Sequence, residues 1–149
     1  MNYYNRAKEL AEETVAHRRY MHKNAEAGLD LPKTKAYVME QLRECGIEPQ
    51  DCGYGVTATL GKGGKVLLLR ADMDALPMKE ESGESFASKN EKMHACGHDL
   101  HTSMLLGAAK LLKAHEDEIC GTVKKLVPAD NTLVLTDGTI IPISDIVEL

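Results

Sequence analysis

The sequence MHACGHDLH at residues 93–101 places three histidines, a cysteine and an aspartate within nine positions. Imidazole, thiolate and carboxylate groups are the ligands that first-row metal ions use in proteins. From Asp99, near the end of this cluster, to about Ala114, apolar residues recur at helical spacing. We therefore predict a metal-binding segment at the N-terminus of a helix, whose inner face is formed by Leu100, Met104, Leu105, Ala108, Leu111 and Leu112.

Two further helices are predicted before this segment. Residues 4–23 contain no Gly or Pro and repeat apolar residues at helical spacing. His17 and His22 lie near the end of this helix, and we interpret them as part of a half-exposed face. A second helix is expected from Pro32 to about Cys45, because proline suits the first helical turn. Gly46 then stands where a left-handed C-terminal cap is wanted.

The strands are predicted from shorter patterns. Alternation of apolar and polar residues predicts a strand over 56–60, and the unbroken apolar run at 66–69 predicts a strand buried on both faces. The turn between them is too short for a crossover helix, so this pair is expected to be antiparallel. A strand at 121–127, reached through the helix after the metal-type cluster, would add a right-handed parallel crossover. These elements predict an α/β fold with a mixed sheet.

The end of the chain has a different composition. Residues 132–149 are rich in β-forming residues, and Asp137-Gly138 between two apolar runs is a strong hairpin signal. We predict a C-terminal β-hairpin there.

Two carboxylates follow the predicted buried strand. Asp72 and Asp74 are two positions apart, so they point the same way if the strand continues. Burying an unpaired carboxylate is costly, so such residues serve either as ligands or as caps of backbone N–H groups. The local sequence leaves these two interpretations equally open.

Composition restricts the compartment and the partners. The chain has 149 residues and a net charge of −5, which predicts one domain, or one domain with a small appendage. Its mixed charges form no basic stripe, which argues against nucleic acid as a partner. No apolar run approaches the ~18 residues of a membrane span, and the polar N-terminus fits no signal peptide. We predict a cytoplasmic protein with no membrane partner, whose four cysteines stay reduced.

Two motifs, RADMDALP at residues 70–77 and MHACGHDLH at 93–101, carry a resemblance to a known family. With residues 17–48 and GTVK at 121–124, they resemble the N-terminal part of a metal-dependent amidohydrolase. The family comprises N-acyl-amino-acid amidohydrolases, hippurate hydrolases and indole-acetyl-amino-acid hydrolases, and is related to the zinc carboxypeptidases. The resemblance covers about residues 3–125. It implies a three-layer α/β/α half-domain of a zinc-peptidase-like fold.

The resemblance also implies roles for individual residues. Cys96 and His98 match the metal ligands of the family, and Asp74 matches the acidic residue that orients a metal-binding side chain. The family site holds two divalent ions, commonly zinc or manganese. They activate a water that attacks the amide carbonyl of a small N-acyl amino acid, and a glutamate takes the proton of that water.

The chain departs from this family after GTVK. Family members continue to Pro-Ala-Glu-Glu, where the first Glu is the base and the second is a ligand. Here residues 128–131 read PADN. Asp130 stands in the place of the base with a side chain one methylene shorter, and Asn131 is a poorer ligand than a carboxylate. The further ligand histidines and the lid or dimerisation domain are missing from the sequence.

We therefore predict residues 1–127 as a truncated amidohydrolase catalytic domain. Residues 128–149 are predicted as a β-hairpin tail that packs on or extends its sheet and resembles the C-terminal hairpin of a small YolD-like protein. The expected function is that of a weakly active or inactive remnant, with a divalent metal or with none bound. The alternative is a non-catalytic interaction module or a homodimer that pairs through an exposed sheet edge, since a partial sheet leaves such an edge unpaired.

Overall fold

The structure is a computed structural model that describes residues 3–61, 67–116, 123–127, 132–135 and 140–142, the last three ranges as backbone only. The chain divides into two units, one formed by residues 1–60 and 70–114 and the other by residues 61–69 and 115–149. The two units are described separately below. Among the described residues, no helix combines the length and the apolar character that crossing a bilayer requires.

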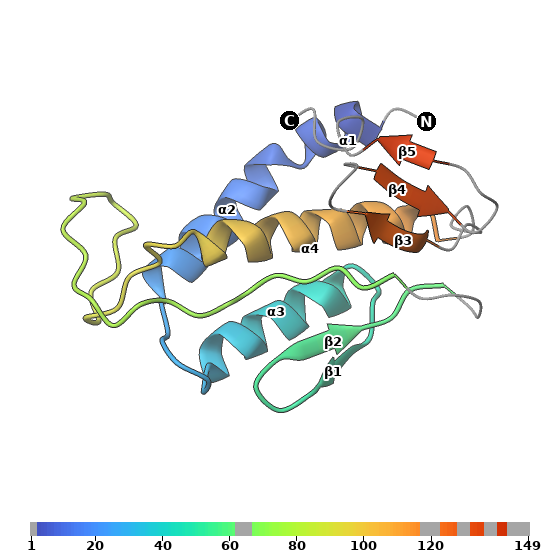
Figure 1. The fold of residues 1–149 in the computed structure, drawn as a ribbon. Coiled ribbons are helices and arrows are strands. Elements are labelled where there is room, and N and C mark those ends of the chain that lie inside the picture. The colour runs from blue at the N-terminus through green and yellow to red at the C-terminus, as the bar shows by residue number, and fades with distance from the viewer. Residues whose placement is uncertain (1–2, 62–66, 117–122, 128–131, 136–139, 143–149) are drawn as a thin grey trace. The chain divides into compact units, whose positions relative to one another are not determined.

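Four helices form most of the first unit (Figure 1). They are α1 (Tyr3–Glu9), α2 (Ala11–Lys23), α3 (Pro32–Glu44) and α4 (His98–Ala114). The predicted helix over 4–23 is present but breaks at Leu10, whose backbone N–H bonds to Ala7 in a tighter turn. Helix α2 packs along α4, and α3 packs on α4 from another side.

Helix α3 begins at the predicted proline and ends at the predicted cap. Gly46 has a φ of +74°, the left-handed region in which a side chain is strained. This turn lets the Ile47 N–H bond back to the Leu42 carbonyl at 2.9 Å. Ile47 is thereby brought into the core beside the last turn of the helix.

The strands of the first unit pair differently from the prediction. β2 (Val56–Ala58) pairs antiparallel with β1 (Pro49–Asp51), and not with residues 66–69. Residues 67–69 have no regular structure, and Leu68 is 80% exposed, so the predicted buried strand is wrong over these residues. A strand needs a neighbour for its backbone N–H and C=O groups, and β1 has taken that place beside β2.

The second unit contains a three-stranded antiparallel sheet in the order β3-β4-β5. Its strands are β3 (Val123–Val127), β4 (Thr132–Leu135) and β5 (Ile140–Pro142). The predicted pairing of a C-terminal hairpin is confirmed between β4 and β5, where Leu133 faces Ile141. The turn residues Asp137 and Gly138 lie outside the described residues.

The α/β class of the fold is confirmed, whereas the described strand pairs are antiparallel. Parallel pairing is confined, in the described part of the chain, to an isolated bridge between Ala27 and Ala75. Leu76 and Met93 form a second isolated bridge, which is antiparallel. The predicted mixed sheet with a parallel crossover is therefore not found among these residues.

The buried face of α4 differs from the predicted one. Its buried residues are Asp99, Thr102, Ser103 and Leu106, which follow the i, i+3, i+4, i+7 spacing of one helix face. Leu100 and Met104, predicted to face inward, are 48% and 47% exposed. The apolar core lies toward the C-terminal half of the helix, where Leu106 packs with residues of α3 and its cap: Val38, Leu42 and Ile47.

The buried face of α2 also differs from the predicted one. His17 and His22 are buried, at 7% and 4% exposure, so their interpretation as a half-exposed face is wrong. Val15, at 46%, lies outside. A polar side chain can be buried on a helix face when its polar atoms have hydrogen-bond partners. Both His17 and His22 have such partners.

We predict opposite outcomes for two leucines of α4. Leu106→Ala should lower the free energy of unfolding by about 2–5 kcal/mol, because it opens a cavity among core side chains. Leu100→Ala should change it by less than about 0.5 kcal/mol, because this side chain is exposed. Urea denaturation measures both values. Equal losses would mean that α4 is rotated relative to the described arrangement.

Candidate metal half-site

The turn that joins Cys96 to His98 starts helix α4. Gly97 has a φ of +81°, and its carbonyl accepts the N–H groups of Leu100 at 3.0 Å and His101 at 3.1 Å. A glycine adopts this conformation without strain. The turn places Cys96 on the surface and His98 partly buried at the first position of the helix. The two predicted metal ligands therefore flank one glycine, as the sequence suggested.

The structure brings His98 and Asp74 together. Nδ1 of His98 lies 3.0 Å from Oδ1 of Asp74 and 2.9 Å from its backbone carbonyl. Both oxygens accept hydrogen bonds, so Nδ1 carries the proton and the lone pair is on Nε2. This is the arrangement by which a carboxylate fixes the ring and tautomer of a metal-binding histidine. Asp72 lies apart from this contact: its side chain pairs with Arg70, and its carbonyl accepts the Thr102 hydroxyl.

A third histidine lies in the same segment. His94 is 5% exposed, and neither of its ring nitrogens has a hydrogen-bond partner in the structure. Burial lowers the pKa of His94, which the charge of Asp99 only partly offsets. A neutral buried imidazole without a partner is a group that a metal ion or a bound water would satisfy.

The described residues do not complete a metal site by themselves. No three His, Cys, Asp or Glu side chains in the described part of the chain lie close enough together to hold one ion. Protein zinc sites use about three or four such ligands. Asp130, predicted in the place of the base, lies outside the described residues. Cys96 and His98 with Asp74 are hereafter called the half-site.

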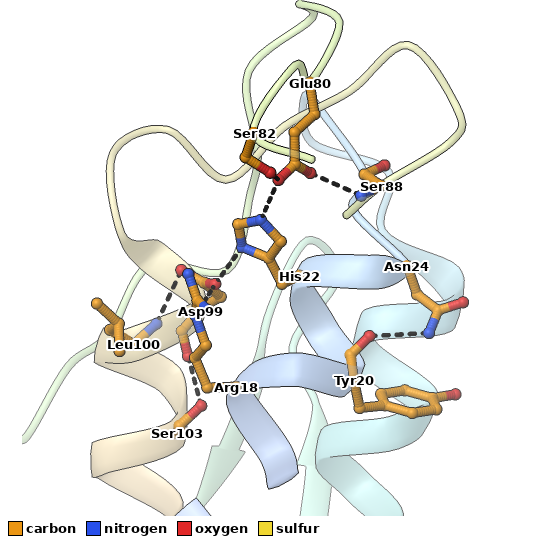
Figure 2. A network of polar contacts seen from close by, with 10 residues as sticks. All are labelled: Arg18, Tyr20, His22, Asn24, Glu80, Ser82, Ser88, Asp99, Leu100 and Ser103. Carbon is orange, nitrogen blue, oxygen red and sulfur yellow. Dashed lines mark hydrogen bonds and ion pairs between the residues drawn. The ribbon is translucent and has the colours of Figure 1, made fainter. Parts of the chain in front are cut away.

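A buried network of polar contacts includes Asp99, the residue after His98 (Figure 2). Nδ1 of His22 lies 2.7 Å from Oδ2 of Asp99, and Nε2 lies 2.9 Å from Oε1 of Glu80. Both carboxylate side chains are completely buried. Arg18 adds an ion pair, with Nε 2.9 Å from Oδ2 of Asp99, although its N–H is not aligned for a hydrogen bond.

Glu80 forms the hydrogen bonds that hold the loop between residues 79 and 92, which joins the two motifs. Its carboxylate accepts the Ser88 N–H at 2.6 Å and the Ser82 hydroxyl at 2.5 Å, in addition to His22. Desolvation alone would raise the pKa of Glu80, but the hydrogen bonds from Ser82, His22 and Ser88 outweigh it and lower the pKa from 4.5 to about 2. The carboxylate is therefore ionised throughout the neutral range.

Sequence reasoning missed His22 and Glu80 and assigned no role to Asp99. Their partners lie 58 and 77 positions away along the chain, so no local motif joins them. The spacing of the first helix does place His17 in one stripe with Leu10, Thr14 and Met21, but this pattern does not include His22.

Comparison with known proteins agrees with this geometry. The model of "Peptidase family M20/M25/M40" matches residues 68–130, which contain all three residues of the half-site. An N-acyl-L-amino acid amidohydrolase of Geobacillus stearothermophilus is 40% identical over 123 residues, covering 79% of this chain and 33% of that protein. Over the matched residues the chain is similar to peptidases and amidohydrolases of the M20 family. The resemblance predicted from the two motifs is thus confirmed.

Two further proteins extend the comparison. The N-acetyl-L-cysteine deacetylase of Bacillus subtilis is 38% identical over 151 residues, covering 94% of this chain and 36% of that protein. That alignment therefore reaches into residues 128–149, whose likeness to a YolD-like protein stays a prediction. The crystal structure of the Bacillus subtilis YXEP protein, described as a dinuclear metal binding peptidase from the M20 family, superposes with a TM-score of 0.70 at 37% identity, covering 74% of this chain and 33% of that one. The chain spans about one third of the length of these relatives.

The lowered pKa of Glu80 predicts a pH dependence of stability. Because its folded-state pKa lies below the unfolded value, its contribution is fully present above about pH 4.5 and is lost as the pH falls toward about 2. The unfolding free energy of the native sequence should therefore fall more steeply over this range than that of Glu80→Gln. Urea denaturation at a series of pH values measures both slopes. Glu81→Gln, at the exposed neighbouring position, should keep the native slope, and an unchanged slope in Glu80→Gln would refute the role of this carboxylate.

Proposed function

We propose that this chain carries part of the metal centre of an amidohydrolase that cleaves the amide bond of N-acyl amino acids. Cys96 and His98 are the proposed ligands, and Asp74 fixes the ring of His98 through Nδ1. The observation that carries the proposal is the contact of 3.0 Å between His98 and Asp74, formed between the two motifs that the sequence shares with the family. The relation to the M20 family supports the reaction class.

The residues fit a divalent ion of the zinc or manganese class only in part. A thiolate and an imidazole suit such an ion. The unpartnered ring of His94 lies in the same segment, but among the described residues it forms no group of three ligands with them. When bound, the metal supplies Lewis-acid activation of water and of the amide carbonyl. Asp130 is the proposed base, and Asp74 keeps the lone pair of His98 on Nε2.

By themselves the 149 residues are proposed to hydrolyse such amides weakly or not at all. The described residues offer two ligands on one turn and no group of three, and a catalytic zinc requires about three protein ligands together with water. The proposed compartment is the cytoplasm. The free thiols of Cys45, Cys52 and Cys96 are consistent with reducing surroundings.

The ligand role of Cys96 is tested by metal titration and by activity. We expect the purified chain to bind added Zn²⁺ or Mn²⁺ weakly, and Cys96→Ala to weaken this binding at least tenfold, as measured by calorimetry. Cys52→Ala, which removes another exposed thiol, should leave it unchanged. Hydrolysis of N-acetyl and N-benzoyl amino acids should stay near the uncatalysed rate. Two tightly held ions with turnover that depends on Cys96 would contradict the proposed low activity, and equal binding by both variants would exclude Cys96 as a ligand.

A second candidate function rests on the exposed residues before Arg70. Leu67, Leu68 and Leu69 are 42%, 80% and 47% exposed. Three adjacent exposed leucines are a typical feature of a strand segment that pairs with another chain. We propose pairing with a second copy as the alternative to catalysis.

Sedimentation equilibrium tests this alternative. The mass should approach that of two chains at high concentration and fall to one chain in Leu68→Asp. Leu29→Asp, at a leucine that is 65% exposed in a different loop, should keep the native mass. A mass of one chain at every concentration would exclude the homodimer.

A further inference from the structure

We propose that His22 is a positioning residue of the half-site. Its imidazole ties the start of α4, which carries His98, to the segment that carries Asp74, and so maintains the contact between them. The inference rests on the proposed function, in which Cys96 and His98 are ligands. It assigns a role to a side chain of α2, a helix that contributes none of the proposed ligands.

The first step is that His22 contacts both segments of the half-site. Asp99, its partner through Nδ1 at 2.7 Å, directly follows His98. Glu80, its partner through Nε2 at 2.9 Å, lies six positions after Asp74. Figure 2 shows the ring lying between the two carboxylates, with α4 on one side and the loop on the other. One side chain therefore connects two segments that are otherwise distant in the sequence.

The second step is that each partner holds its own segment rigidly. Oδ1 of Asp99 accepts the Leu100 N–H at 3.0 Å, and the Asp99 carbonyl accepts the Ser103 hydroxyl. Asp99 is 1% exposed. On the other side, Glu80 holds Ser82 and Ser88 of the loop. A displacement of His22 would therefore move whole segments and not single side chains.

The third step fixes the register of the Asp74 segment. Ala75 donates its N–H to the Glu26 carbonyl at 2.7 Å, and Leu76 exchanges two backbone hydrogen bonds with Met93, at 2.9 and 3.0 Å. Asp74 thus precedes a short stretch that is held at Ala75 and Leu76 by backbone contacts and at Glu80 by His22. The bond between His22 and Glu80 is a buried link from this stretch to α2 that a substitution can remove without altering the backbone.

The fourth step is that His22 can position the half-site but cannot itself bind the metal ion. Both ring nitrogens of His22 are engaged by carboxylates, so no lone pair is left for a metal ion. His17 offers a matched comparison, because it lies on the same helix and is 7% exposed. Its Nδ1 forms a hydrogen bond of 2.7 Å, and its Nε2 lies 3.6 Å from Oε1 of Glu13 on the same helix. The partner of Nδ1 is the hydroxyl of Tyr37 on α3, away from the half-site.

The test compares His22→Gln with His17→Gln. A glutamine amide can donate to one carboxylate but turns its oxygen toward the other, so His22→Gln breaks the link while His17→Gln can keep a bond to a hydroxyl. The exchange rates of the backbone amides of residues 99–101 and 82–88 report whether His22 still connects the two segments, and this measurement needs no metal. We expect exchange on the order of tenfold faster in His22→Gln, as for the loss of one charged hydrogen bond, and native rates in His17→Gln.

The second readout is binding of Co²⁺, whose charge-transfer absorption reports a bond to the Cys96 thiolate. The apparent Kd should rise by roughly 10–100-fold in His22→Gln, the usual effect of losing a residue that supports a metal ligand, and stay within twofold of native in His17→Gln. The pair His22→Gln with Glu80→Gln should restore part of the exchange protection in the loop. There the new amide at position 80 can donate to the amide oxygen at position 22.

Equal effects of His22→Gln and His17→Gln on exchange and on Co²⁺ binding would overturn the positioning role and reduce His22 to a core residue. Absence of Co²⁺ binding in the native chain would overturn the proposed function, while hydrogen exchange would still decide whether His22 links the two segments. If His22→Gln fails to fold, Glu80→Gln alone should accelerate exchange in residues 99–101, to which Glu80 is joined through His22, and native rates there would refute the link.

Discussion

The pairing of His22 with two buried carboxylates is the interaction on which the first unit depends. Asp99 and Glu80 have no exposed side-chain surface, and a carboxylate without a partner in such a place would cost several kcal/mol. The structure meets this requirement with one imidazole between them and with Arg18 beside Asp99. Helix α2, the start of α4 and the loop after residue 79 are thus held together by one buried network of hydrogen bonds and ion pairs.

This network explains how α4 is oriented. Its N-terminal half buries Asp99, Thr102 and Ser103 and leaves Leu100 and Met104 outside, and only from Leu106 onward does it contribute to the apolar core. The helix is therefore fixed at one end by hydrogen bonds and at the other by packing. Hydrogen bonds are directional, so the polar end determines the rotation of the helix. That rotation places His98 against Asp74 and leaves Cys96 on the surface.

Much of the fold could be predicted from the sequence, because it depends on local patterns. The three helices, the cap at Gly46 and the C-terminal hairpin all rest on patterns within a few residues, whereas the ligand roles proposed for Cys96 and His98 come from the likeness of their motif to a family. The errors arose where a partner is remote. The polar face of α4 was read as exposed because its partners, His22 and the Asp72 carbonyl, are more than 25 positions away. Leu67–Leu69 was read as a buried strand from composition alone, although a strand forms only where another strand is available to pair with it.

Nitrogen-edited NMR of the imidazole groups tests most directly whether His22 donates to two carboxylates at once. We predict two hydrogen-bonded ring N–H protons for His22, one near the first turn of α4 and the other near Ser82 and Ser88 of the loop. We also predict that Glu80→Gln shifts the second signal and leaves the first in place. A single ring N–H proton on His22, or a pair that is insensitive to the substitution at Glu80, would contradict the double pairing of His22.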